Sequence, residues 1–108
     1  MSYTRLNPKE STGASSSGLT VTPQSGYTVT LDYAKRYGNV VAAELHLTTN
    51  TAKSSGGSFN PFTTNMKYAV ISGVYFHGLV PTSGNAWIKL ASDLTTSVSY
   101  NFTMVGIL

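Results

Sequence analysis

Apolar and polar side chains alternate at every second position over long stretches of this 108-residue chain. From residue 27 the apolar positions are Tyr27, Val29, Leu31 and Tyr33, which alternate with Thr28, Thr30, Asp32 and Ala34. Near the end, Val98, Tyr100, Phe102 and Met104 alternate with Ser97, Ser99, Asn101 and Thr103. A period of two residues is typical of β-strands, because successive side chains point to opposite faces of the sheet. We therefore expect an all-β chain with hydroxyl-rich outer faces, and no segment with a helical period competes.

The composition favours binding or assembly over catalysis. Charged residues make up 10% of the chain, against roughly 25% in average soluble domains. The chain has no cysteine, which excludes disulfides and thiolate metal sites and leaves the redox compartment open. A sheet protein with so few ionisable groups is better suited to packing against copies of itself or to holding neutral polar ligands.

The chain divides into two parts. Residues 1–18 contain a run of Ser, Thr, Gly and Ala with few apolar side chains, which predicts a flexible or arm-like N-terminal segment. Residues 19–108 have the length of one domain. Short strands in this part are separated by turns rich in Gly, Pro, Asn and Ser, and we expect a hairpin turn around residues 36–39. This spacing indicates an antiparallel β-sandwich or a small barrel.

Residues 66–80 are apolar at both parities, unlike the other strands. This pattern predicts a strand buried on two sides, either within a sandwich or between subunits, with a bulge at Gly73 and a turn at Gly78. The last residues, Ile107 and Leu108, are also apolar. Surplus apolar surface of this kind predicts contacts between copies of the chain. The candidate interface residues are Tyr68, Val70, Ile71, Val74, Phe76, Ile107 and Leu108.

Catalytic and metal chemistry find little support in the sequence. Asp32 and Glu44 fall on neighbouring strands of the expected hairpin, where paired carboxylates are able to hydrolyse glycosidic bonds, but two acids on an outer face are more often solvated charges. Glu44, His46 and His77 include metal-ligand types, yet no pattern places His77 near the other two. We therefore predict a non-enzymatic protein without metal or cofactor.

Nucleic acids and membranes are also unfavoured as partners. The net charge is +3, but the seven basic residues are dispersed and only Lys35 and Arg36 are adjacent. A phosphate-binding surface needs clustered cations. No stretch has the roughly 20 apolar residues of a membrane span, and the first residues lack the apolar run of a secretory signal. We expect a protein that neither binds nucleic acid nor inserts into membranes.

Saccharide binding is the more plausible chemistry. Saccharides are held by stacking on an aromatic face together with hydrogen bonds from hydroxyl, amide and imidazole groups. For Trp87 a role as a core or interface residue is the alternative, and the sequence leaves both open. The candidate saccharide-binding residues are Trp87, His46, His77, Tyr75, Tyr37 and Asn85.

Residues 33–41, with the sequence Tyr-Ala-Lys-Arg-Tyr-Gly-Asn-Val-Val, are followed by an alternating strand, a Ser/Gly loop and the segment Ala-Trp-Ile-Lys-Leu at 86–90. This layout resembles the C-terminal head domains of tail fibre, baseplate and receptor-binding proteins of phages that infect Gram-positive bacteria. The resemblance covers residues from about 19 to 108. It implies a jelly-roll-like sandwich and a homotrimer on a virion tail or baseplate, acting outside the cell. The outer surface or the subunit clefts would recognise host cell-wall saccharide.

The resemblance also implies that the N-terminal arm attaches the domain to other virion tail proteins. The main alternative is a structural virion protein, such as a capsid decoration or tail-assembly subunit, that binds only other virion proteins. A glycan-degrading enzyme that uses Asp32 and Glu44 is a third and more remote reading.

Overall fold

The computed structural model describes residues 17–108, and in this part of the chain the fold is an all-β, antiparallel sandwich of two sheets. The predicted fold class is thereby confirmed, whereas the jelly-roll arrangement stays a prediction. The expected arm, residues 1–18, lies almost wholly outside the described residues. The strands are β1 (Val21–Pro23), β2 (Tyr27–Tyr37), β3 (Val40–Thr49), β4 (Ser58–Phe59), β5 (Phe62–Thr64), β6 (Lys67–Ser72), β7 (Phe76–Val80), β8 (Trp87–Leu90) and β9 (Tyr100–Ile107).

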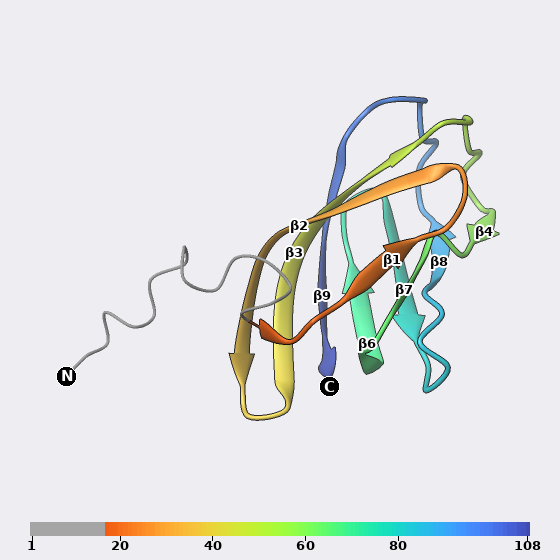
Figure 1. The fold of residues 1–108 in the computed structure, drawn as a ribbon. Coiled ribbons are helices and arrows are strands. Elements are labelled where there is room, and N and C mark those ends of the chain that lie inside the picture. Colours follow the sequence, from red (N-terminus) through yellow and green to blue (C-terminus); the bar gives the residue numbers. More distant parts are fainter. Residues whose placement is uncertain (1–16) are drawn as a thin grey trace.

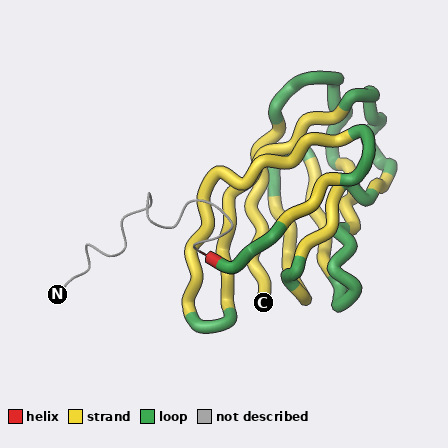
Figure 2. The backbone as a smooth tube through the Cα atoms, in the orientation of Figure 1, coloured by secondary structure: helices red, strands yellow, loops and turns green. Residues whose placement is uncertain are grey.

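Seven strands form one sheet in the order β2-β3-β9-β6-β7-β8-β4, and β1 pairs with β5 in a second, two-stranded sheet. The last strand therefore lies inside the larger sheet, between β3 and β6 (Figure 1). Strands dominate the tube view, and loops gather at the ends of the sheets (Figure 2). The final strand thus joins two segments that are far apart in the sequence.

The core lies between the two sheets. On β3 the apolar residues at alternate positions form the inner face, and Val41, Ala43, Leu45 and Leu47 are all buried. Phe62 of β5 stacks against Phe102 of β9 with ring centroids 5.9 Å apart, which ties the small sheet to the large one. Phe59, which follows the Ser/Gly loop, is buried as well. The two phenylalanines therefore anchor the stretch between residues 48 and 65 to the core.

A β-bulge in β2 changes the predicted alternation. Leu31 pairs with Leu45 and Tyr33 pairs with Glu44, so Asp32 is an extra residue in the ladder. The parity of every later residue in β2 is therefore reversed. Ala34 is buried and Tyr33 is only partly buried, which is the opposite of the predicted assignment.

The prediction of one strand over residues 66–80, buried on both sides, was wrong. The segment is the hairpin β6–β7, and Gly73 lies in its turn, whereas Gly78 lies within β7 and pairs with Ile88 of β8. The bulge is at Tyr68 instead: Lys67 pairs with Ile107 and Val70 with Val105, so two residues of β6 face the single Gly106. Within the single chain, one face of this hairpin is buried and the other is open to solvent.

Candidate functional site

The outer face of the seven-stranded sheet, opposite the core, carries three parallel rows of side chains that run across the strands. Cross-strand register places each member beside the next. The first row, at the end of the sheet that holds the β2–β3 turn, is Tyr37, Val40, Ile107 and Lys67. The second row is Lys35, Ala42, Val105, Val70, Leu79 and Trp87. The third row begins with Tyr33, Glu44, Thr103 and Ser72, and is continued by the pair His77 and Lys89.

The rows divide the outer face into an apolar half and a polar half. Apart from Lys67 at the end of the first row and Lys35 at the start of the second, every side chain of these two rows is apolar or aromatic. The third row carries hydroxyls, an imidazole and charges. Seven of the apolar side chains are large and exposed: Tyr37, Val40, Val70, Leu79, Trp87, Val105 and Ile107. Monomeric proteins rarely expose a contiguous apolar area of this extent, and such areas mark interaction sites. The outer face is therefore the candidate functional surface of this domain.

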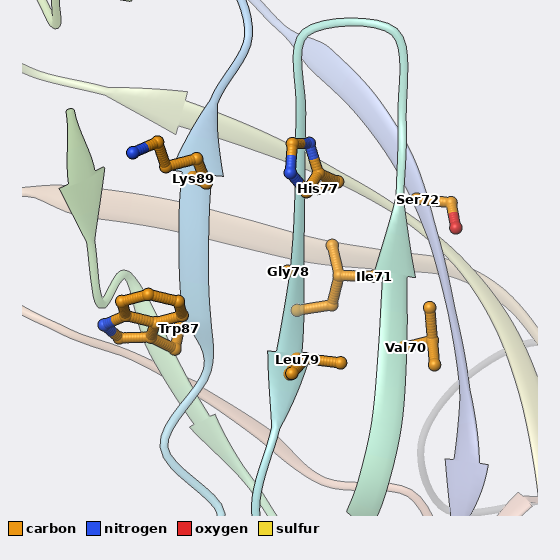
Figure 3. A pocket seen from close by; sticks show the side chains of 8 residues that line it. All are labelled: Val70, Ile71, Ser72, His77, Gly78, Leu79, Trp87 and Lys89. Atoms are coloured by element: carbon orange, nitrogen blue, oxygen red, sulfur yellow. The ribbon is translucent and has the colours of Figure 1, made fainter. Parts of the chain in front are cut away.

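A shallow hollow of about 520 Å³ lies where the two halves meet, over β6, β7 and β8. Figure 3 shows Trp87 and Lys89 projecting from β8, His77 and Leu79 from β7, and Val70 and Ser72 from β6. We call this site the Trp87 hollow. Its remaining lining residues are Ile71 and Gly78.

The Trp87 hollow combines an aromatic face with a few polar groups. Trp87 is 52% exposed and stands beside Leu79, its partner in the ladder. His77 and Lys89 form the neighbouring cross-strand pair and are also exposed. An exposed indole offers a flat apolar surface with an N–H donor at its edge. The site is therefore able to stack against a ring and to exchange hydrogen bonds at one side of that ring.

A second hollow, of about 260 Å³, contains the two carboxylates considered above. Asp32 and Glu44 both line it, so the expectation that they share the outer side of the hairpin is confirmed. Asp32 Oδ2 lies 2.8 Å from Nδ1 of His46, and the two side chains form an ion pair when the imidazole is protonated. Asn101 and Thr103 line the same hollow. Both carboxylates thus line a solvent-facing hollow, and Asp32 is engaged with a histidine.

Only two of the six candidate saccharide-binding residues meet: Trp87 and His77 share the Trp87 hollow. His46 lies on β3 beside Asp32, and Asn85 lies in the turn before β8, where it bridges to Thr63. Tyr75 contacts the ring of Tyr100, with centroids 4.7 Å apart. The sequence did not single out Lys89 or Leu79, although their alternation with buried Ile88 and Val80 placed them on the same outer face.

Tyr37 lies at the far end of β2, away from the hollow. The Nζ atom of Lys35 is 5.6 Å from the centre of its ring. Hydrogen bonding with Tyr37 raises the pKa of Lys35. Tyr37 thus belongs to the apolar half of the face rather than to a shared site with Trp87.

The candidate interface residues separate into two groups. Ile71 and Phe76 lie in the core of the single chain, so they have no surface to offer a second copy, and Leu108 packs partly against that core. Val74 is exposed in the β6–β7 turn. The remaining three, Tyr68, Val70 and Ile107, are exposed, and the strand register places Val70 and Ile107 on the apolar half of the outer face. Val40 and Val105 complete this half, and the sequence analysis did not single them out.

Among residues 17–108, no group of three or more His, Cys, Asp or Glu side chains is placed to hold a metal ion. The same part of the chain contains no helix that is long and apolar enough to cross a membrane. Compared with protein-family models, with curated proteins and with solved structures, the chain matches none of them.

Proposed function

We propose that this chain is a non-enzymatic receptor-binding module of a phage tail or baseplate, and that it recognises a host cell-wall saccharide at the Trp87 hollow. In this proposal the module acts on the virion, outside the cell, as a homotrimer joined to other tail proteins. Its sandwich would have the jelly-roll-like arrangement of the head domains that the sequence resembles.

The observation that carries the saccharide proposal is the exposed indole of Trp87 beside a cross-strand pair of polar residues. Sugar rings present an apolar face of C–H groups and a rim of hydroxyls, which match an aromatic platform flanked by hydrogen-bonding groups. His77 and Lys89 supply such groups on one side of the hollow, and Ser72 supplies a hydroxyl. Leu79 and Val70 form an apolar floor beside the indole.

Binding of the purified protein to isolated cell walls of Gram-positive bacteria tests this proposal. Trp87→Leu keeps an apolar side chain but removes the aromatic face, and it should weaken binding by about 5- to 140-fold if ring stacking contributes about 1–3 kcal/mol, as it does for nucleobases. Trp87→Phe retains an aromatic ring and should keep most of the affinity. His77→Ala should weaken binding to a smaller extent.

Val98→Leu is the matched control, because Val98 is an exposed apolar residue outside the three rows. The control should bind as the unsubstituted protein does. Equal binding by Trp87→Leu and the control would contradict the assigned site. Absence of binding to all walls, soluble wall polysaccharides included, would contradict saccharide recognition itself.

The apolar half of the outer face favours a second candidate, a structural virion protein that binds only other virion proteins. A row of aliphatic side chains suits a protein partner at least as well as a sugar, since protein interfaces bury apolar and aromatic side chains at their centres. Wall binding separates the two candidates: this second function predicts none, while retaining assembly with tail or capsid proteins.

A further inference from the structure

Five exposed side chains lie at the end of the seven-stranded sheet that holds the β2–β3 turn. Tyr37 pairs with Val40, and Val40 pairs with Ile107, so these three form one continuous line across β2, β3 and β9. Val105 stands next to them on β9, and Tyr68 adjoins Lys67, the partner of Ile107. Each of the five is between 42% and 67% exposed. We call them the terminal patch.

Tyr68 is the most exposed member of the terminal patch, at 67%, and its backbone is in an unfavourable conformation. Its φ is +52°, in the left-handed region that favours glycine. A bulky side chain rarely occupies this region, because its Cβ crowds the following carbonyl group. The bulge that creates this conformation leaves Ala69 packed against Gly106 and leaves Tyr68 as the unpaired residue. The chain thus holds a largely exposed aromatic side chain in a conformation that costs backbone energy.

We propose that the terminal patch is the surface through which copies of this chain pack against one another. An aromatic side chain buries about 150–250 Å² and an aliphatic one less, so the five partly exposed side chains together present on the order of a few hundred Å² of mostly apolar surface. A standard stable interface buries about 800 Å² per copy, and the patch would form the apolar centre of a contact of that size.

The composition of the terminal patch identifies a second copy as the occupant. Transient contacts between different proteins are about as apolar as the rest of the surface, whereas contacts between identical subunits are more apolar. The patch contains only aromatic and β-branched side chains, and its flanking charges are Lys35 and Lys67. A second copy brings tyrosine rings to these lysines, and Lys35 already lies over a tyrosine ring within its own chain.

The proposed contact leaves the third row and the rim of the Trp87 hollow at the edge of the interface. It names the surface for the self-association that the proposed function includes, and it does not rest on saccharide binding. Its failure and the failure of wall recognition are therefore separate results.

Sedimentation velocity over a micromolar concentration series tests the contact with a matched pair of variants. Val105→Thr combined with Ile107→Thr keeps β-branched residues on an exposed strand face, so the fold is retained, and circular dichroism verifies this. The unsubstituted protein should sediment as a dimer or trimer, and the double variant should shift to monomer with at least a tenfold weaker association. Val98→Thr, outside the patch, should leave the assembly unchanged.

Two results would overturn the proposal. One is a monomer at every concentration of the unsubstituted protein. The other is an assembly that the double variant weakens no more than Val98→Thr does. Wall binding by Trp87→Leu, which leaves the terminal patch intact, reports the Trp87 hollow while assembly is unchanged.

Discussion

The Nδ1 atom of His46 lies 2.8 Å from Oδ2 of Asp32, although the two residues are not partners in the ladder. Thr30 is the residue opposite His46, and Asp32 is the extra residue of the bulge. The bulge therefore turns the Asp32 carboxylate toward the neighbouring strand. It also reverses the parity of the rest of β2, so that Lys35 and Tyr37 join the outer rows.

The interaction between Asp32 and His46 is expected to contribute little to stability, because both side chains are partly exposed. A double-mutant cycle with Asp32→Asn and His46→Gln, measured by urea unfolding at neutral pH, should give a coupling free energy of about 0.5 kcal/mol and below about 1 kcal/mol. A coupling of several kcal/mol would instead indicate a rigid, desolvated pair. Such a result would make the second hollow, which Asp32 and Glu44 line, a candidate catalytic site.

Gly78 is expected to be indispensable for the geometry of the Trp87 hollow. A Cβ at this position would overlap the carbonyl oxygen of Trp87 and lie 2.9 Å from Cα of Ile88. Gly78→Ala should therefore push β8 away from β7 and lower the free energy of unfolding by about 1–3 kcal/mol or more. Urea unfolding followed by the fluorescence of Trp87, the only tryptophan, measures the stability and the environment of the indole together.

Gly57→Ala is the control for this substitution. A Cβ on Gly57 meets its nearest neighbour, the carbonyl oxygen of Ser54, at 3.4 Å, which is an ordinary contact. This variant should unfold within about 0.5 kcal/mol of the unsubstituted protein, as surface substitutions usually do. Equal stability of the two variants would show that β7 and β8 separate without cost, and the hollow would then be deformable.

The fold class followed from the alternation of side chains, and so did the inner face of β3. A single bulge is invisible to this reasoning, since Asp32 continues the polar phase of the sequence and the reversal becomes apparent only from the pairing of Tyr33 with Glu44. The same limit applied to residues 66–80. Apolar residues at both parities fit a strand buried on two sides, and they fit equally a hairpin with one face in the core and the other on an apolar surface.

The candidate site was partly predictable. Trp87 and His77 have suitable chemistry and lie on one surface, but their proximity depends on the β7–β8 register, in which Leu79 meets Trp87. The rows themselves depend on β9 inserting between β3 and β6, which brings Val105 between Ala42 and Val70. Such long-range order leaves no mark in local sequence, and for this reason Val40 and Val105 escaped notice.

Tyr68 offers a test in which stability and association change in opposite directions. Asparagine adopts the left-handed conformation more readily than tyrosine does. Tyr68→Asn should therefore raise the free energy of unfolding by about 0.5–1 kcal/mol, if the backbone strain is of the usual size. The same substitution removes the most exposed aromatic ring of the terminal patch, so self-association should weaken. The stability measurement belongs in the Val105→Thr, Ile107→Thr background, because assembly itself stabilises the folded state.

Ser97→Asn is the matched control, since Ser97 also has a positive φ, +63°, and lies outside the terminal patch. It should keep or slightly raise the stability while leaving the sedimentation behaviour unchanged. If the Tyr68 ring served only the fold, it would pack within the chain, and Tyr68→Asn would lower the free energy of unfolding. Lower stability of Tyr68→Asn with unaltered assembly would therefore contradict the role of Tyr68 as a contact between copies. Higher stability with weaker assembly would show that the backbone strain at Tyr68 is the cost of that contact.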